Sequence, residues 1–424
     1  MFASYFPLLL LSSMCYIYIH CYLGQRYRHQ QISTSSDFLT AVVSVDDEFG
    51  VSVANLPDLD GDSIDDLVVG MYKADGGKGA AMILFLNSSG HSKSHQVISA
   101  TKGFFTGSLS TVSQWGNFGT GSTSLGDIDG DQLSDIAVGA YCQDSYMGAL
   151  YIIFLAADGT CMSHQKIASR SGGFTASLPG SSTFGFSVSN AGDLNGDGVS
   201  DAITGAQMAD IGEYRSGSVY ILMLDSNGLC LSHVPINSQD GYFTGVLAEQ
   251  ARFGQSCTML GLVDGVHESV VVGAPHYSNE AYRDGSIFVI FLNSNLQAVS
   301  HHKISAISED FTAVLGEEAY FGRSSANMGD IDGDGVTDVA VGMLLDAGAV
   351  FMMFMNSAGQ CRSHLKISPM SAPFTFEVVA GGRFGTGVAN IGDRDRNGFT
   401  DMAIGAQIDG SVFILFDVDG NHPP

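Results

Sequence analysis

A nine-residue acidic segment that recurs in register constrains the fold of this chain more than any other feature. Its clearest copy, Asp330-Ile-Asp-Gly-Asp-Gly-Val-Thr-Asp338, follows Phe321-Gly322 and precedes Val341-Gly342. The Phe-Gly pair marks six successive units, spaced by 63 to 69 residues. Its six copies are Phe49-Gly50, Phe118-Gly119, Phe184-Gly185, Phe253-Gly254, Phe321-Gly322 and Phe384-Gly385. A chain built from one repeated unit is expected to form a repeat architecture in which neighbouring units share a core.

Each unit reads as four short β-strands. Its apolar segments are four to eight residues long and are bounded by Gly, Asn, Asp or Ser, as in Ser218-Val-Tyr-Ile-Leu-Met-Leu224. No segment shows a sustained period of 3.6 residues, so almost no helix is expected after residue 24. Four antiparallel strands per unit, repeated radially, are typical of a β-propeller blade. The predicted fold class is all-β, a six-bladed β-propeller.

The two ends of the chain predict how the ring closes. The last unit stops at Phe413-Ile-Leu-Phe-Asp-Val-Asp-Gly420 and lacks the Ser-His-x-Lys-Ile strand of the other units. A matching segment, His29-Gln-Gln-Ile-Ser33, stands before the first unit. We therefore expect the N-terminal strand to complete the C-terminal blade, which leaves no unpaired edge at that seam. The alternative of seven blades would need one more unit of sequence.

The acidic segments have the spacing of a calcium loop. Carboxylates or an Asn stand at positions 1, 3, 5 and 9, and position 7 offers its backbone carbonyl, as at the start of an EF-hand. A donor set made only of oxygen favours Ca²⁺ or Mg²⁺ over zinc or copper, and flexible carboxylate-rich geometry favours Ca²⁺. Five segments are complete, so about four to five Ca²⁺ ions are expected as cofactors. The five candidate ligand sets are Asp58, Asp60, Asp62, Ile64 and Asp66; Asp127, Asp129, Asp131, Leu133 and Asp135; Asp193, Asn195, Asp197, Val199 and Asp201; Asp330, Asp332, Asp334, Val336 and Asp338; and Asp393, Asp395, Asn397, Phe399 and Asp401.

Two of the six repeats depart from this pattern. The loop at 393–401 carries Arg394 and Arg396 between its ligands, and these two cations are expected to make it the weakest or an empty site. The remaining repeat, Leu262-Val-Asp-Gly-Val-His-Glu-Ser269, keeps only Asp264 and is expected to bind nothing. In the complete loops, the simplest role of the metal is structural, because bound Ca²⁺ offsets the repulsion among carboxylates that crowd one turn.

The charge of the chain agrees with a demand for cations. The net charge is -26, from 44 Asp and Glu against 18 Lys and Arg. Such a chain repels nucleic acid and anionic membrane surfaces. Of the acids, 18 stand at loop ligand positions (4+4+3+4+3). Of the seven Cys, three occupy one repeated position and should lie far apart, so no disulfide framework is expected; these three are Cys161, Cys230 and Cys361.

The N-terminal segment 1–24 is almost uncharged and is followed by the basic residues Arg26 and Arg28. Its length and apolar character fit either a signal peptide or a membrane anchor, with the propeller spanning 29–424. Calcium loops of this kind suit the calcium-rich exterior, and Asn87-Ser-Ser89 is a glycosylation sequon. We expect a secreted or cell-surface protein that meets a membrane only through this segment, if it is not cleaved.

The combination of Phe-Gly, Gly-Asp-x-Asp-Gly-Asp-Gly-x-x-Asp and Val-Gly-Ala resembles the FG-GAP repeats of integrin alpha-chain propellers. The resemblance covers residues 29–420. It implies a calcium-stabilised propeller that works in extracellular recognition or adhesion. Two departures stand out, since integrin alpha propellers have seven blades and carry leg domains that this sequence does not show. Pairing with an integrin beta chain is therefore not expected from the resemblance.

The loops that differ between units are the expected place for specificity. They should lie on the rim opposite the calcium loops, where we expect a protein or glycan ligand to contact Tyr277, Tyr282 and Arg283. No motif of nucleophilic or metal-assisted catalysis is present, so the chain is not expected to be an enzyme. The alternative is a lectin or hydrolytic enzyme with its site at the channel mouth. Histidines recur in step with the blades and are expected to be structural hydrogen-bonding residues; they are His95, His164, His233, His301 and His364.

Overall fold

A computed structural model of the chain describes residues 28–34, 39, 43–109, 117–279, 281–369, 377–379 and 381–418. The N-terminal segment 1–24 and the final residues of the predicted propeller domain lie outside the described residues. Among the helices that the structure describes, none combines the length and the apolar character needed to cross a membrane.

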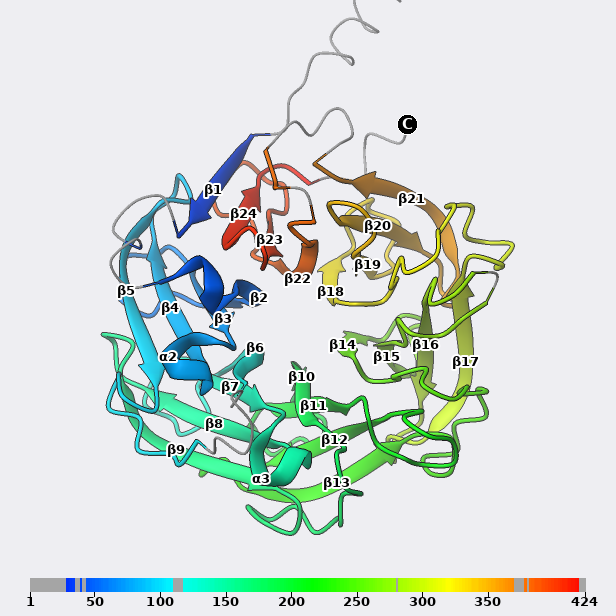
Figure 1. Cartoon of the computed structure of the whole chain (residues 1–424), viewed down its shortest axis with the longest axis horizontal. Coiled ribbons are helices and arrows are strands. Elements are labelled where there is room, and N and C mark those ends of the chain that lie inside the picture. The colour runs from blue at the N-terminus through cyan, green and yellow to red at the C-terminus, as the bar shows by residue number, and fades with distance from the viewer. Residues whose placement is uncertain are drawn as a thin grey trace, which may run out of the picture.

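The described strands form six four-stranded antiparallel sheets arranged around a ring (Figure 1). The first blade consists of β2 (Phe49–Leu56), β3 (Asp66–Met71), β4 (Ala80–Leu86) and β5 (Ser92–Ser99). The second consists of β6 (Phe118–Gly126), β7 (Asp135–Ala140), β8 (Ala149–Leu155) and β9 (Cys161–Ala168). The third consists of β10 (Phe184–Gly192), β11 (Asp201–Ala206), β12 (Ser218–Leu224) and β13 (Cys230–Ile236).

The second half of the ring repeats this arrangement. The fourth blade consists of β14 (Ser256–Gly261), β15 (Glu268–Gly273), β16 (Ser286–Leu292) and β17 (Ala298–Ser305). The fifth consists of β18 (Ser325–Gly329), β19 (Asp338–Met343), β20 (Ala349–Met355) and β21 (Cys361–Ile367). The sixth consists of β22 (Phe384–Asn390), β23 (Met402–Ala406), β24 (Ser411–Leu415) and β1 (His29–Ser33). The prediction of a six-bladed all-β propeller is confirmed, and the seven-bladed alternative is not what the chain forms.

The ring closes as the sequence predicts, since the N-terminal strand β1 pairs antiparallel with β24, with His29 opposite Leu415 and Ser33 opposite Ser411. Helix is almost absent from the described residues. It is limited to the short turns η2 (Val45–Asp47), α2 (Ala74–Gly77) and α3 (Gln143–Tyr146).

Two repeated glycines explain why the blades can pack so closely. The glycine of Phe-Gly opens the innermost strand of one blade, and the glycine of Val-Gly-Ala lies in the second strand of the blade before it. A Cβ added to the second glycine would lie 1.7–2.1 Å from the carbonyl oxygen of the first, so only glycine fits. The contact recurs at all six seams, including the closing one; its pairs are Gly70 and Gly119, Gly139 and Gly185, Gly205 and Gly254, Gly273 and Gly322, Gly342 and Gly385, and Gly405 and Gly50.

The hydrophobic core is divided into clusters, each shared by two neighbouring blades. Within a seam, the Phe of Phe-Gly packs against the Phe of the preceding Phe-Thr segment, as in Phe311 and Phe321, whose ring centroids are 5.0 Å apart. The repeated histidine packs on the same ring, with His364 5.0 Å from Phe311. The predicted structural role of these histidines therefore rests mainly on aromatic packing, although His233 is also within 3.2 Å of the Thr175 hydroxyl.

The five cysteines among the described residues are buried free thiols. The repeated ones lie at the starts of outer strands in different blades, as the sequence predicts. Burial raises the pKa of Cys161 to about 11, which keeps that thiol protonated at neutral pH.

Candidate metal loops and the opposite rim

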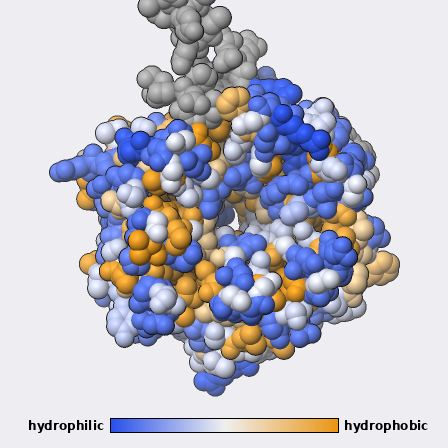
Figure 2. All heavy atoms as spheres, turned by 180° about the vertical axis from the view of Figure 1, so that it is seen from behind, coloured by the Kyte–Doolittle hydropathy of each residue, from blue (hydrophilic) through white to orange (hydrophobic). Residues whose placement is uncertain are grey.

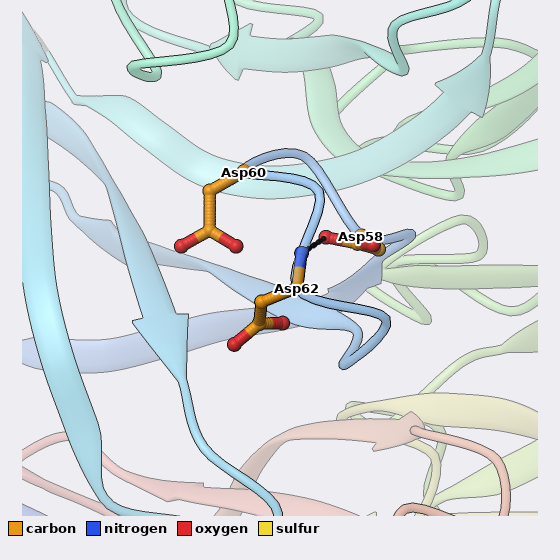
Figure 3. A group of neighbouring side chains, drawn as sticks. All are labelled: Asp58, Asp60 and Asp62. Carbon is orange, nitrogen blue, oxygen red and sulfur yellow. Dashed lines mark hydrogen bonds between the residues drawn. The ribbon is translucent and has the colours of Figure 1, made fainter.

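The five acidic loops join the first and second strands of their blades. In each loop the position 1 carboxylate organises the turn by accepting backbone N–H groups. Gly61 and Asp62 donate to Oδ1 of Asp58 at 2.7 and 3.1 Å, and Ser63 donates to Oδ2 at 2.6 Å. Figure 3 shows the Asp62 amide turned toward Asp58, while the side chains of Asp60 and Asp62 extend from the same tight turn. The turn thus gathers carboxylates before any metal is considered.

The position 9 aspartate is the buried anchor of each loop. Asp338 accepts the N–H of Ile331 at 3.1 Å and the N–H of Met355 at 2.9 Å, so it ties the loop to the third strand of the blade. Burial raises the pKa of Asp338 to about 6, although these two hydrogen bonds oppose the shift and Asp332 and Asp334 add to it. The equivalent residues make the same pair of bonds and show the same direction of pKa shift; they are Asp66, Asp135, Asp201 and Asp401.

Four of the five loops bring three carboxylates together, with one oxygen from each lying within 4.8 Å of the others. These groups are Asp58, Asp60 and Asp62; Asp127, Asp129 and Asp135; Asp330, Asp332 and Asp338; and Asp393, Asp395 and Asp401. In the third loop, position 3 is Asn195, whose amide donates to Asp197 at 3.0 Å while its oxygen accepts the Asp197 N–H at 2.8 Å. The side-chain donors of all five loops are oxygen, which fits a hard cation such as Ca²⁺.

The position 7 residues take part through their backbone. Each donates its N–H to the side-chain oxygen at position 5, over 2.8–2.9 Å. These residues are Ile64, Leu133, Val199, Val336 and Phe399. The position 5 side chain is therefore held by the turn, and one of its oxygens is already engaged.

Two loops have a basic side chain from within the fourth strand of the same blade beside their carboxylates. Lys93 in β5 pairs with Asp60 at 2.9 Å and also with Asp62. Arg362 in β21 pairs with Asp334 at 2.7 Å and also with Asp332. At the equivalent strand position the second and third blades carry exposed apolar residues, Met162 and Leu231. The sequence motif could not show this difference, because the cation comes from the fourth strand.

The arginines of the fifth loop lie elsewhere than the sequence suggests. Arg394 is buried and donates to the backbone carbonyl of Asp65, and Arg396 donates to the carbonyl of Ser63 at 3.1 Å, so both reach the loop of the neighbouring first blade. The cation that pairs with a carboxylate of the fifth loop is Arg28, which contacts Asp395. Arg394 still interacts electrostatically with Asp401 of its own loop, so Arg28 adds to the positive charge that is expected to weaken this site.

The repeat of the fourth blade, at 262–269, holds its turn with a histidine side chain instead of a set of metal ligands. Asp264 accepts the backbone N–H of His267 at 2.7 Å, and its second oxygen lies 2.7 Å from Nδ1 of the same residue. The hydrogen bonds from His267 lower the pKa of Asp264 to about 2. The one remaining carboxylate of this turn is therefore ionised, and its hydrogen bonds are made within the turn.

The rim opposite the loops carries the residues predicted for ligand contact, and they are not equivalent. Tyr282 is exposed, and the Arg283 guanidinium stacks over its ring at 4.6 Å. Tyr277 instead packs against the core and lies under the Lys303 ammonium, 3.5 Å from its ring centre. Arg252 and Arg323 flank Phe-Gly pairs, which places them on this rim near the innermost strands. Neither was singled out from the sequence, although their position beside the Phe-Gly pair could have indicated this location.

A narrow cavity of about 80 Å³ lies among the innermost strands. Its lining includes Phe186, Gln255 and Arg323, each of which directly follows a Phe-Gly pair. Seen from behind, the ring has a hollow at its centre, surrounded by a mixture of hydrophilic and hydrophobic residues (Figure 2).

The fold and its repeated acidic loops define a β-propeller built from acidic-loop repeats. The family model of the FG-GAP repeat matches residues 184–222, which span β10, the third acidic loop, β11 and most of β12. The chain is a β-propeller in which residues 184–222 match the FG-GAP repeat, and it resembles integrin alpha chains.

Three relatives show the extent of that resemblance. Integrin alpha-6 of Gallus gallus is 27% identical over 238 residues, which are 56% of this chain and 20% of the relative. Integrin alpha-4 of Xenopus laevis is 28% identical over 244 residues, 55% of this chain and 20% of the relative. Integrin alpha-M of Mus musculus is 40% identical over 96 residues, 22% of this chain and 8% of the relative. The matched region thus spans a fifth or less of each relative.

Among solved structures, the crystal structure of BBS1N in complex with ARL6DN, soaked with lead, aligns with a TM-score of 0.39 at 12% identity. The alignment covers 87% of this chain and 79% of that chain.

Proposed function

We propose that this chain is a calcium-binding extracellular recognition module, in which Ca²⁺ stabilises one rim and a protein ligand binds the other. The observation that carries the calcium proposal is the convergence of three carboxylates within 4.8 Å in four loops of equivalent position. Bound Ca²⁺ would supply positive charge at the centre of each group. The chain itself holds each loop in shape, because the position 1 carboxylate accepts the backbone N–H groups of the turn and the position 9 carboxylate ties the loop to the third strand.

The proposal of an adhesive role draws support from the integrin alpha relatives and from the unequal loops of the opposite rim. The proposal of a secreted or cell-surface location is supported by the same relatives and by the calcium proposed for the loops. We propose binding rather than catalysis, since the repeated histidines are held against phenylalanine rings within the blade seams.

Thermal unfolding in 2 mM Ca²⁺, 2 mM Mg²⁺ and EDTA tests the metal proposal. At a free Ca²⁺ concentration a hundred times Kd, each site would contribute about 2.7 kcal/mol to the stability of the folded chain. We expect a marked fall in Tm in EDTA, restored by Ca²⁺ and less well by Mg²⁺. An equal Tm in all three buffers would exclude calcium stabilisation.

A matched pair of variants assigns the effect to a loop. Asp127→Asn combined with Asp129→Asn should reduce the number of bound Ca²⁺ ions, measured by isothermal titration calorimetry, by one. Glu249→Gln removes a negative charge from an exposed residue outside the loops and should leave the number unchanged. Equal loss in both variants would point to general attraction of cations by an acidic protein.

A further inference from the structure

Five arginines from the third to the sixth blade lie on the rim opposite the acidic loops. The backbone N–H of Arg252 donates to the carbonyl oxygen of Arg215 at 3.2 Å. Arg252 also interacts electrostatically with Arg215 and Arg283, and Arg323 interacts with Arg252 and Arg383. None of the five forms an ion pair with a carboxylate in the part of the chain that the structure describes. On a chain with 44 acids against 18 bases, this concentration of uncompensated positive charge calls for a physical reason.

The scaffold does not require these arginines, because they do not recur with the blades. Arg252 and Arg383 directly precede Phe-Gly pairs, where the other blades have residues such as Glu48, Asn117 and Thr183. All of these positions have a left-handed backbone, with φ of +56° at Arg252 and +58° at Arg383. The blades therefore share the backbone conformation at this position, but they do not share the positive charge. Glycine contacts and aromatic packing explain the features that repeat around the ring. Neither of them explains the presence of the arginines.

Aromatic side chains hold the cluster in place. The Arg283 guanidinium stacks over Tyr282 and donates to the Tyr320 hydroxyl at 3.5 Å. The ring of His276 lies 4.9 Å from that of Tyr320. Arg323 lies 5.4 Å from the centre of the Phe186 ring. Planar guanidinium groups fixed in this way lose little side-chain entropy when they bind an anion.

The electrostatics favour an anionic ligand. Arg252, Arg283 and Arg323 are half-buried, and Arg323 lines the narrow cavity. Burial lowers the pKa of His276 to about 3, and the three arginines add to that shift, so this histidine is neutral at physiological pH. Two acidic groups reach the cluster by hydrogen bonds without pairing with a guanidinium: Asp210 accepts the backbone N–H of Arg215 at 2.8 Å, and Glu318 accepts from the Tyr320 hydroxyl at 3.3 Å. Like charges held close without a counterion raise the energy of the free protein, and an anion between them relieves it.

We propose that this arginine cluster, Arg215, Arg252, Arg283, Arg323 and Arg383, binds the carboxylates of an acidic segment of a partner protein. The proposal rests on the proposed recognition function and names its ligand chemistry. Guanidinium forks pair with carboxylates in a bidentate manner, and arginine clusters recognise acidic motifs in this way. A single acidic side chain can enter the narrow channel end-on toward Arg323. The acidic remainder of the chain repels extended anionic surfaces, which favours a short segment.

Fluorescence polarisation of a labelled Glu- and Asp-rich heptapeptide, measured with the full chain in 2 mM Ca²⁺ and low salt, tests the proposal. We expect saturable binding that Arg252→Gln combined with Arg283→Gln weakens by about tenfold or more. Lys102→Gln removes an exposed cation outside the cluster and should change the affinity less than about twofold. An equal loss of peptide affinity in the arginine variant and in Lys102→Gln would overturn the proposal. The absence of peptide binding by the unchanged chain would also overturn it.

Two further measurements separate the explanations. Calcium titration of the arginine variant should match that of the unchanged chain, so loss of peptide binding with intact calcium binding tests the cluster alone. A failure to bind calcium in the unchanged chain would count against the proposed function instead. A sulfated oligosaccharide is titrated in parallel; binding of that probe through the cluster, without binding of the peptide, would overturn the assignment to an acidic protein segment.

Discussion

Replacing the second-strand glycine of a blade with alanine should break the closest contact between blades. At Gly139 an added Cβ would lie 1.7 Å from the carbonyl oxygen of Gly185 and 2.8 Å from its carbonyl carbon. Both are backbone atoms, so no side chain can turn aside to relieve the overlap. The second and third blades would have to separate by more than an ångström, and the buried residues shared across that seam would lose contact.

The expected cost follows from that geometry. Overpacking a core by one methyl group lowers the free energy of unfolding by about 1–3 kcal/mol. Here the added methyl group clashes with backbone atoms that cannot turn aside, so we expect a loss of about 3 kcal/mol or more. The entropy of unfolding is about 2.1 cal/mol/K per residue, or about 0.8 kcal/mol/K for a propeller of about 390 residues. A loss of about 3 kcal/mol would therefore lower Tm by about 4 °C if unfolding is cooperative.

Gly180→Ala is the matched control. Gly180 lacks a positive φ, and an added Cβ there would have no atom within 4 Å among the described residues. Alanine at such a site is expected to be neutral or to stabilise by up to about 1 kcal/mol. Urea unfolding of both variants in 2 mM Ca²⁺, followed by circular dichroism, measures the difference. If Gly139→Ala unfolds within about 0.5 kcal/mol of the unchanged chain, the glycine contact does not hold the seam.

Two further predictions concern single buried groups. Asp201→Ala leaves two backbone N–H groups without their acceptor and should cost about 2–4 kcal/mol in urea unfolding, with the cost persisting in EDTA. Asp197→Asn, at an exposed loop position, should by contrast lose its effect in EDTA, and the reverse pattern would contradict the assigned roles. His276 has a pKa lowered from 6.5 to about 3, chiefly by burial. The arginines that contribute to this shift are Arg252, Arg283 and Arg323. Below pH 6.5 the unfolded chain takes up a proton that the folded chain does not, so stability falls as the pH falls toward 3. Between pH 7.5 and pH 5 the His276 contribution should cost about 2 kcal/mol, and His276→Gln should reduce the pH dependence by that amount. An identical pH dependence in the His276→Gln variant would contradict this reasoning.

The ring could be predicted from sequence because its determinants repeat. Phe-Gly spacing counts the blades, and the displaced strand at His29-Gln-Gln-Ile-Ser33 identifies the closure, which the pairing of β1 with β24 confirms. The acidic loops were also placed correctly between the first and second strands, since their spacing is local. Their occupancy by calcium stays a prediction.

The features that escaped prediction depend on contacts between distant segments. Lys93 and Arg362 face acidic loops from the fourth strand of their own blades, about 30 residues away along the chain. Arg394 reaches across the closing seam to Asp65, more than 300 residues away. The arginines at the channel mouth come from different blades and form a cluster only when the ring closes. No spacing rule along one unit could have shown any of these contacts.

The innermost strands run from one rim to the other, so a ligand bound at one rim can stabilise the seams between blades. Each innermost strand starts at a Phe-Gly pair or a few residues after one, and it ends at a turn on the opposite rim. An acidic segment that contacts Arg252, Arg323 and Arg383 would bridge the fourth, fifth and sixth blades, directly beside the glycine contacts that join them. Because such a ligand binds only the closed ring, its binding energy adds to the stability of those seams. In the fifth and sixth blades, the proposed Ca²⁺ would act at the far ends of the same strands, so ligand and metal would stabilise these blades from opposite rims without sharing a residue.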